Sequence, residues 1–271
     1  MYARFFIYIL LIALAVFQAI PLLLMFLNTL RTNAQIKTMP LSIPETWEWD
    51  NFIKTWTSGG YVTAYRNSII VSAVTIAIVI VCTLFAAYAM TRLKLPLNRL
   101  FTGYFVLGLS FPAFLYIIPN YFLMSRIGLV NNLLGLIILY SAGALPLNLI
   151  MMRTYLMGIP KSIDEAAYVD GCTPQTAIWY IIIPLARPII TTVALLVFVS
   201  SWNEFLFANT FIVTDSLRTV STRFVRFTGE WSSDLSKIYT AAVITAGPIM
   251  IMYIFLQKKF IEGITKGGVK G

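Results

Sequence analysis

Residue types that carry out catalysis are scarce in this 271-residue sequence. It contains no histidine, the commonest general base and metal ligand in proteins. Its two cysteines, Cys82 in an apolar stretch and Cys172 in a polar one, are not expected to form a disulfide. The sequence has neither a G-x-x-x-x-G-K-[ST] nucleotide loop nor a G-x-S-x-G nucleophile motif. We therefore expect no catalytic residue, no metal site and no cofactor in this chain.

The most informative polar segment, residues 160–188, begins with the pattern of a short helix. Pro160 and Ser162 open it, and the S-x-x-E spacing from Ser162 to Glu165 predicts a capping box. Gly171 is expected to end this helix, because glycine is the residue best suited to a left-handed C-terminal cap.

The same segment predicts a second helix directly afterwards. Thr173 suits the N-cap and Pro174 the first helical position. This helix should run to Ile183 before Pro184 and Pro188 break it, because proline lacks the backbone N–H that a helix interior needs.

The composition places both helices in a membrane protein. Hydrophobic residues make up 59% of the chain and charged residues 11%, whereas soluble domains carry about 25% charged residues. The mean hydropathy is +0.81. The net charge of +9 fits basic loops facing anionic lipid better than it fits nucleic-acid binding.

Six apolar stretches are each long enough to cross a bilayer, which takes about 20 helical residues. We expect a single all-α transmembrane domain with spans near residues 5–27, 67–91, 100–124, 131–152, 188–214 and 238–257. Pro112 and Pro119 should break the third span, which is tolerated where backbone lines a cavity or is buried in protein.

Short loops rich in Lys and Arg indicate the cytoplasmic side. Loop 92–100 carries three basic residues and no acid, whereas the opposing short loop near 125–130 has only Arg126. We therefore expect both termini and the polar loop 153–187 to be cytoplasmic. Total basic counts on the two sides, 11 and 9, do not decide the orientation by themselves.

The polar loop resembles the EAA loop of ABC-importer permeases. That loop has the form E-A-A, three residues, G, nine residues and I-x-L-P. Here Glu165-Ala166-Ala167 is followed by Gly171 at the expected spacing, and the run ends at Pro184. The one departure is Ile183 in place of Leu, a change that conserves volume.

Residues of about 100–271 are similar to carbohydrate permeases of the maltose-transporter type, through Ile159-Pro160, Trp202-Asn203-Glu204-Phe205 and the ending at 263–271. The resemblance implies a bacterial inner-membrane location and a cytoplasmic coupling helix between spans four and five. It also implies partners: a second permease that is a different chain, two ATPases that bind ATP and Mg, and an extracytoplasmic solute-binding protein.

The resemblance assigns ATPase coupling to the EAA loop, with Ala166, Ala167, Tyr168 and Val169 as the packing face. The residues concerned are Glu165, Ala166, Ala167, Tyr168, Asp170, Gly171 and Pro184. The alternative is that Glu165 only caps the helix and Gly171 only ends it.

Polar residues near the midplane or outer mouth of the spans could line a solute pathway. These are Ser110, Pro112, Asn120, Tyr140, Ser141, Ser200, Ser201, Asn203 and Glu204. Glu204, the one acid within a span, could instead pair with a neighbouring helix or reach the headgroups. For the small residues, close helix packing is the simpler interpretation.

An outer stretch with Arg218, Arg223 and Arg226 contains no acid over nine residues. It could meet an acidic binding-protein lobe or an acidic saccharide. We favour a solvated or headgroup-facing stretch.

These observations predict a permease subunit of an ATP-driven carbohydrate importer that forms half of the translocation pathway. The alternatives are a permease for glycerol phosphate or another non-sugar solute, an ion-coupled secondary transporter, and an intramembrane enzyme. Secondary transporters more often carry several charges within their spans, whereas this chain carries one. An intramembrane enzyme would need catalytic groups that this chain lacks. The sequence does not identify the saccharide.

Overall fold

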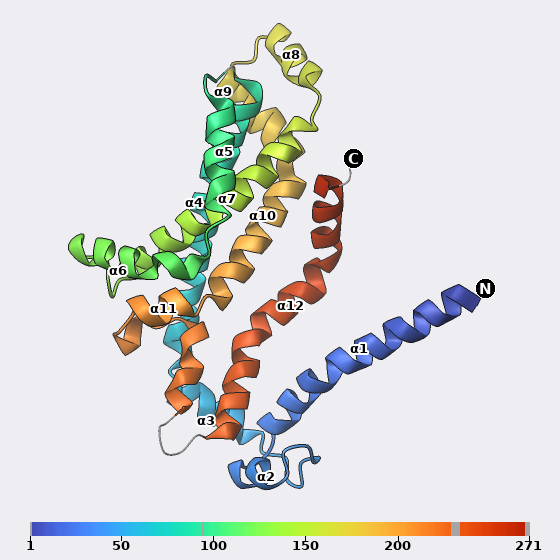
Figure 1. Ribbon diagram of the computed structural model, residues 1–271, viewed down its shortest axis with the longest axis vertical. Coiled ribbons are helices and arrows are strands. Elements are labelled where there is room, and N and C mark those ends of the chain that lie inside the picture. The colour runs from blue at the N-terminus through green and yellow to red at the C-terminus, as the bar shows by residue number, and fades with distance from the viewer. Residues whose placement is uncertain (1, 94, 229–233, 269–271) are drawn as a thin grey trace. The chain divides into compact units, whose positions relative to one another are not determined.

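The computed structural model describes residues 2–93, 95–228 and 234–268, with side chains over 4–93, 95–228 and 234–255. Within these ranges the chain forms helices and no β-strand (Figure 1). The α-helices are α1 (Tyr2–Thr29), α2 (Asn33–Thr38), α3 (Asp50–Ser58), α4 (Tyr61–Arg92), α5 (Asn98–Gly108), α6 (Ile117–Arg126), α7 (Leu133–Met157), α8 (Lys161–Val169), α9 (Pro174–Ala177), α10 (Ile183–Asn203), α11 (Leu206–Phe211) and α12 (Leu235–Gly268). Short 3₁₀ helices, η1 (Ala113–Tyr116), η3 (Asp215–Leu217) and η4 (Val220–Phe227), and a π-helical turn, η2 (Ile178–Ile182), complete the described structure.

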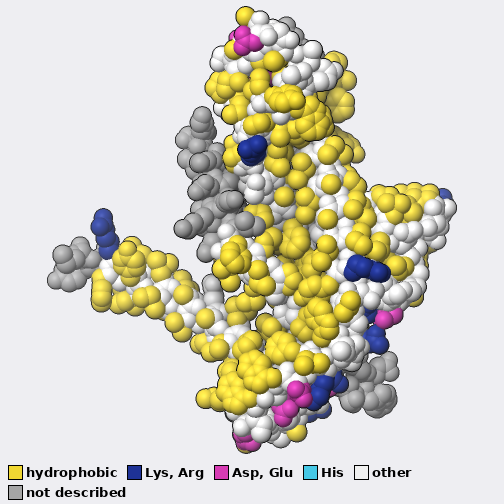
Figure 2. Space-filling model, turned by 180° about the vertical axis from the view of Figure 1, so that it is seen from behind, with side chains coloured by type: hydrophobic (Ala, Val, Ile, Leu, Met, Phe, Trp, Pro, Cys, Tyr) yellow, Lys and Arg dark blue, Asp and Glu magenta, His cyan; other side chains and the backbone are white. Residues whose placement is uncertain are grey.

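Among the residues that the structure describes, five helices are long and apolar enough to cross a membrane, which confirms the predicted all-α membrane fold. They are Arg4–Thr29, Tyr61–Arg92, Leu133–Met157, Pro174–Asn203 and Leu235–Phe255. Two shorter pieces, Asn98–Gly108 and Ala113–Arg126, bend by 93° and would together make a sixth span. Figure 2 shows hydrophobic side chains over most of the visible surface, with few charged groups, most of them towards its lower end, as expected for a chain solvated by lipid.

The third and fifth predicted spans differ from the helices observed. Helix α5 ends at Gly108, and the backbone is extended at Pro112, so the predicted break occurs there. Pro119 does not break the chain, because it lies in the first turn of α6, where a proline N–H is not needed. The fifth span was predicted to reach residue 214, but α10 ends at Asn203.

The described chain divides into two compact units, residues 1–65 with 219–250 and residues 66–218 with 251–271. In the first unit, the guanidinium of Arg31 organises the loop after α1. Arg31 is 1% exposed. It donates to the carbonyls of Gln35, Met39 and Pro40, to Asn28 Oδ1 and to Ser42 Oγ, over 2.5–3.3 Å.

Arg223, in the same unit, is also fully buried, at 1% exposure. The expectation that the outer basic stretch is solvated is therefore wrong for this residue. Gly60 adopts φ +65° beside its guanidinium, and a Cβ there would lie 3.6 Å from the guanidinium atoms. A buried arginine needs its donors satisfied, so Arg223 is a structural element of this unit.

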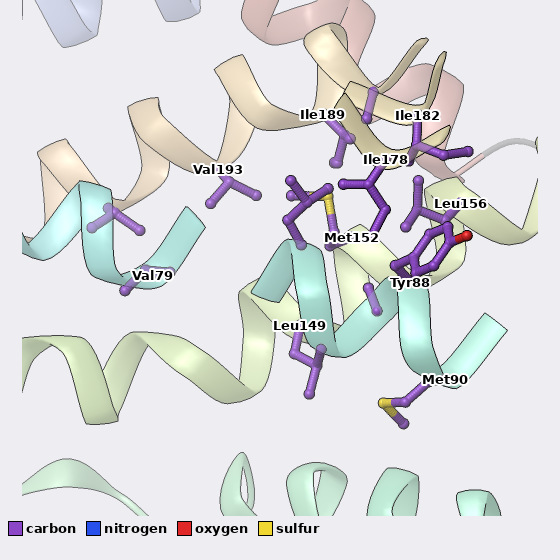
Figure 3. Packing of buried hydrophobic residues seen from close by; sticks show 14 residues of the cluster. Val79, Tyr88, Met90, Leu149, Met152, Leu156, Ile178, Ile182, Ile189 and Val193 are labelled. Atoms are coloured by element: carbon purple, nitrogen blue, oxygen red, sulfur yellow. The ribbon is translucent and has the colours of Figure 1, made fainter. Parts of the chain in front are cut away.

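The second unit is built on a core shared by α4, α7, η2 and α10. Figure 3 shows this cluster: Tyr88 of α4 lies beside Leu156 of α7, with Ile182 of η2 nearby, and Val79 of α4 lies on the side of Val193 of α10. These side chains are at most 3% exposed. Their burial fixes the relative positions of the helices that carry the polar loop.

A second cluster joins α7 to α6 and α11 at the other end of this unit from α8 (Figure 1). Tyr121 of α6 lies against Phe211 of α11, with ring centroids 5.5 Å apart. The tail after residue 255 is predicted to be cytoplasmic, and its side chains are not among those that the structure describes.

Candidate functional site: the loop that carries α8

Helix α8 starts two residues earlier than a capping box at Ser162 would require. Pro160 is the N-cap, with φ −57° and ψ 134°, and no side chain caps the helix. Ser162 is therefore already the second helical residue and cannot act as N-cap. The predicted capping box between Ser162 and Glu165 is wrong.

The C-terminus of α8 is ended as predicted. Gly171 adopts φ +84°, which only glycine reaches without steric cost. Its N–H donates to the Tyr168 carbonyl at 3.1 Å, and Cys172 N–H donates to the Ala167 carbonyl at 2.9 Å. These two bonds form a Schellman motif, so the end of α8 is held at a fixed angle.

The second helix begins as predicted but does not end at the prolines. Thr173 Oγ1 accepts a hydrogen bond from Thr176 N at 3.3 Å, and Pro174 follows in the first turn. A π turn over Ile178–Ile182 then leads directly into α10, so the expected breaks at Pro184 and Pro188 are wrong. Pro184 lies in the first turn of α10, directly after the π turn, and a proline is tolerated in a first turn.

The EAA residues lie on different faces of α8. Ala167 is 5% exposed and faces its own chain, whereas Val169 is 88% exposed. Glu165 and Ala166 are exposed as well. Of the expected packing face from Ala166 to Val169, only Ala167 is buried, and the surface open to a partner includes Ala166, Tyr168 and Val169 beside Glu165.

A buried ion pair joins α8 to the end of α4. Arg92 Nε lies 2.7 Å from Asp164 Oδ2, and the two side chains are 5% and 7% exposed. These two atoms do not have the geometry of a hydrogen bond, so the interaction between them is electrostatic. Arg92 Nη2 also donates to the Ile159 carbonyl at 3.0 Å. Sequence reasoning missed this pair, since nothing local to either residue indicates the other.

Other basic groups gather beside this ion pair. A cavity of about 300 Å³ is lined by Arg92, Arg153 and Lys161 together with residues from the ends of α4 and α7 and the start of α8. The lining of this cavity is therefore basic, whereas Asp164, Glu165 and Asp170 of the loop that carries α8 are acidic.

Two of the predicted pathway residues contact each other at the end of α10. Tyr140 OH donates to Glu204 Oε2 at 2.8 Å. Glu204 also accepts from Phe207 N at 2.9 Å and Ala208 N at 3.0 Å. In this structure Glu204 caps α11 and ties it to α7.

The remaining pathway candidates are dispersed. Ser201 Oγ donates to Ser72 Oγ of α4 at 2.9 Å, and Ser200 Oγ donates within its own helix to the Val197 carbonyl. Ser141 is buried at 5%. Of the others, Ser110, Pro112 and Asn203 are exposed and Asn120 is half-buried. Their role in a pathway stays a prediction.

Within the side chains described, no group of three or more His, Cys, Asp or Glu residues could hold a metal ion. The site is instead a short helix, α8, which is capped at its C-terminus and joined to α4 by an ion pair. One of its faces is exposed.

Known proteins resemble the chain over nearly its whole length. It is 33% identical over 93% of its length to a probable ABC transporter permease of Bacillus subtilis, covering 84% of that protein. It is 32% identical over 94% of its length to the trehalose transport permease SugB of Mycobacterium tuberculosis, covering 93% of it. It is 37% identical over 76% of its length to the trehalose/maltose permease MalG of Thermococcus litoralis, covering 74% of it.

A solved structure shares the fold. A chain of a bacterial ABC transporter that imports the acidic polysaccharide alginate superposes with a TM-score of 0.83 at 22% identity, covering 95% of this chain and 97% of that chain. Residues 79–266 match the family model described as the inner membrane component of binding-protein-dependent transport systems. This match includes the whole EAA-type loop, and the chain therefore belongs to that family of ABC-importer permeases.

Proposed function

We propose that this chain is the permease subunit of an ATP-driven importer for a mono- or oligosaccharide. The names of its relatives support this substrate class, since they include permeases for trehalose, diacetylchitobiose and arabinooligosaccharides. The chain forms one half of a translocation pathway and carries out no chemistry itself. ATP and Mg²⁺ are bound by partner ATPases.

The proposed assembly contains a second permease of different sequence, two ATPase subunits and an extracytoplasmic binding protein. Both termini and α8 lie in the cytoplasm, and the basic lining around Arg92, Arg153 and Lys161 supports this orientation. The binding protein selects the saccharide.

The observation that carries this proposal is the exposed face of α8. A helix end with Val169 88% exposed, on a segment fixed by a Schellman motif, suits docking in a groove on a partner. Its small neighbour Ala166 permits close approach.

The test is uptake by the complex that co-purifies with this chain, reconstituted in vesicles with its binding protein and labelled saccharides. ATP clamped inside the vesicles should drive uptake without any ion gradient. Uptake driven by a proton or sodium gradient in the absence of ATP would instead establish a secondary transporter. Accumulation of glycerol phosphate but of no saccharide would refute the substrate class.

A further inference from the structure

Helices α4 and α8 meet through two matched pairs of side chains. Tyr88 and Arg92 are four residues apart on α4, and Asp164 and Tyr168 are four residues apart on α8, so each pair shares one helix face. Arg92 Nε lies 2.7 Å from Asp164 Oδ2. Tyr88 OH lies 3.3 Å from Tyr168 OH. The two helices are therefore joined at two points one turn apart.

The ion pair is shielded from water. Its side chains are 5% and 7% exposed, and charges in such surroundings attract more strongly and are screened less than at a surface. The bond from Arg92 Nη2 to the Ile159 carbonyl adds a contact to the chain just before α8. Arg92 thus holds both the entry to α8 and its first turn.

The covalent connections of α8 are less direct. On one side Gly158, Ile159 and Pro160 lead from α7, and on the other the turn through Gly171 leads to α9 and the π turn before α10. By contrast, α4 packs directly on α7 and α10 through the core cluster, and Ser72 of α4 accepts a hydrogen bond from Ser201 of α10.

We propose that Arg92 is a positioning residue that clamps α8 onto the end of α4 through Asp164. A displacement of α8 by the ATPase then reaches α4 directly, as a rigid movement, and not only through the loops that lead to α7 and α10. This inference rests on the proposed function, because it concerns how that function is driven.

The clamp is tested by removing each charge while keeping the side chain close to its native size. Arg92→Gln and Asp164→Asn are compared with the charge swap Arg92→Asp/Asp164→Arg. The matched control is Arg99→Gln, since Arg99 is an exposed arginine near the same end of the unit. The quantity measured is saccharide taken up per ATP hydrolysed, normalised to the amount of assembled complex.

We expect each single variant to lower uptake per ATP by about tenfold or more, because a buried charge has lost its partner. The swap should recover part of that loss, because it restores the pair of charges but not the bond from Arg92 Nη2 to the Ile159 carbonyl. Arg99→Gln should behave like the parent.

A second readout needs no transport. Spin labels at Leu93→Cys and Ser162→Cys, both exposed and outside the proposed docking residues, report the separation of α4 and α8 in the full complex after Cys82 and Cys172 are replaced by Ser. The distance distribution should stay the same with and without ATP in the parent. In Asp164→Asn it should broaden and change with nucleotide.

The outcomes separate this inference from the proposed function. A parent complex without ATP-driven uptake would overturn the proposed function, while the label separation would still test the clamp. A parent that transports, with single variants that match its uptake per ATP, would overturn the clamp alone. The clamp would also be overturned if the loss of uptake were fully explained by loss of assembled complex. It would likewise be overturned if Asp164→Asn left the label separation unchanged.

Discussion

At the residue scale, single side chains and one glycine fix the geometry of segments that have no large core of their own. Gly171 ends α8 at φ +84°, and Arg31 gathers five acceptors in the loop after α1. The glycine could be predicted, because a helix end is a local property. The role of Arg31 could not, because its acceptors are mostly backbone carbonyls of following residues, whose positions depend on the fold of the loop.

Gly171→Pro should abolish transport and the association with the ATPase while leaving membrane insertion intact. Proline fixes φ near −65°, far from +84°, and it removes the N–H that donates to the Tyr168 carbonyl. Uptake and co-purification are measured together with the membrane content of the variant. The control is Gly143→Ala, where a Cβ meets nothing within 4 Å and both readouts should match the parent. Normal transport by Gly171→Pro would show that the end of α8 is not needed for docking.

Arg31→Ala should destabilise the first unit by at least about 2 kcal/mol, because buried carbonyls lose a charged donor. The thermal midpoint of the detergent-solubilised protein measures this effect. Lys54→Ala is the control: its ion pair with Asp50 spans 3.8 Å between side chains that are 58% and 73% exposed, so little change is expected. Equal midpoints for the two variants would contradict the role given to Arg31.

At the element scale, the hydropathy of the sequence predicts the spans, but it does not predict all of their breaks or the contacts between them. The interruption at Pro112 was predictable because proline lacks an N–H. By contrast, the helix continues through Pro184 and Pro188 after a π turn that no local sequence pattern indicates. The capping box failed for a similar reason: the S-x-x-E pattern is present, but Pro160 starts the helix earlier. The ion pair between Arg92 and Asp164 joins segments far apart in sequence, so only packing could reveal it.

Glu204→Ala should loosen the corner between α10 and α11. Phe207 N–H, Ala208 N–H and Tyr140 OH would lose their acceptor, at a cost of about 3 kcal/mol, since each unsatisfied buried donor costs on the order of 1–3 kcal/mol. Thermal unfolding measures the loss. Ser200→Ala serves as control, because its hydroxyl donates within its own helix, and it should cost less than about 1 kcal/mol. If Glu204→Ala lowered uptake without any loss of stability, a direct pathway role would be favoured instead.

At the scale of the whole molecule, composition alone indicated a membrane protein, and the family match over residues 79–266 agrees with the resemblance seen in the loop. The division into two compact units was not predicted, because the contacts that define it connect segments from both ends of the chain. The pathway residues were chosen by depth along each span. That criterion ignores the direction in which a side chain points, and Tyr140 and Ser201 prove to contact other helices.

We propose that energy from ATP enters this chain through the exposed face of α8. The most direct test of this proposal is a photo-crosslinker placed at Val169, which is 88% exposed, in cells that express the full complex. The account predicts a crosslink to a subunit that carries a G-x-x-x-x-G-K-[ST] nucleotide loop. A crosslink to an extracytoplasmic protein, and to no nucleotide-binding subunit, would contradict it.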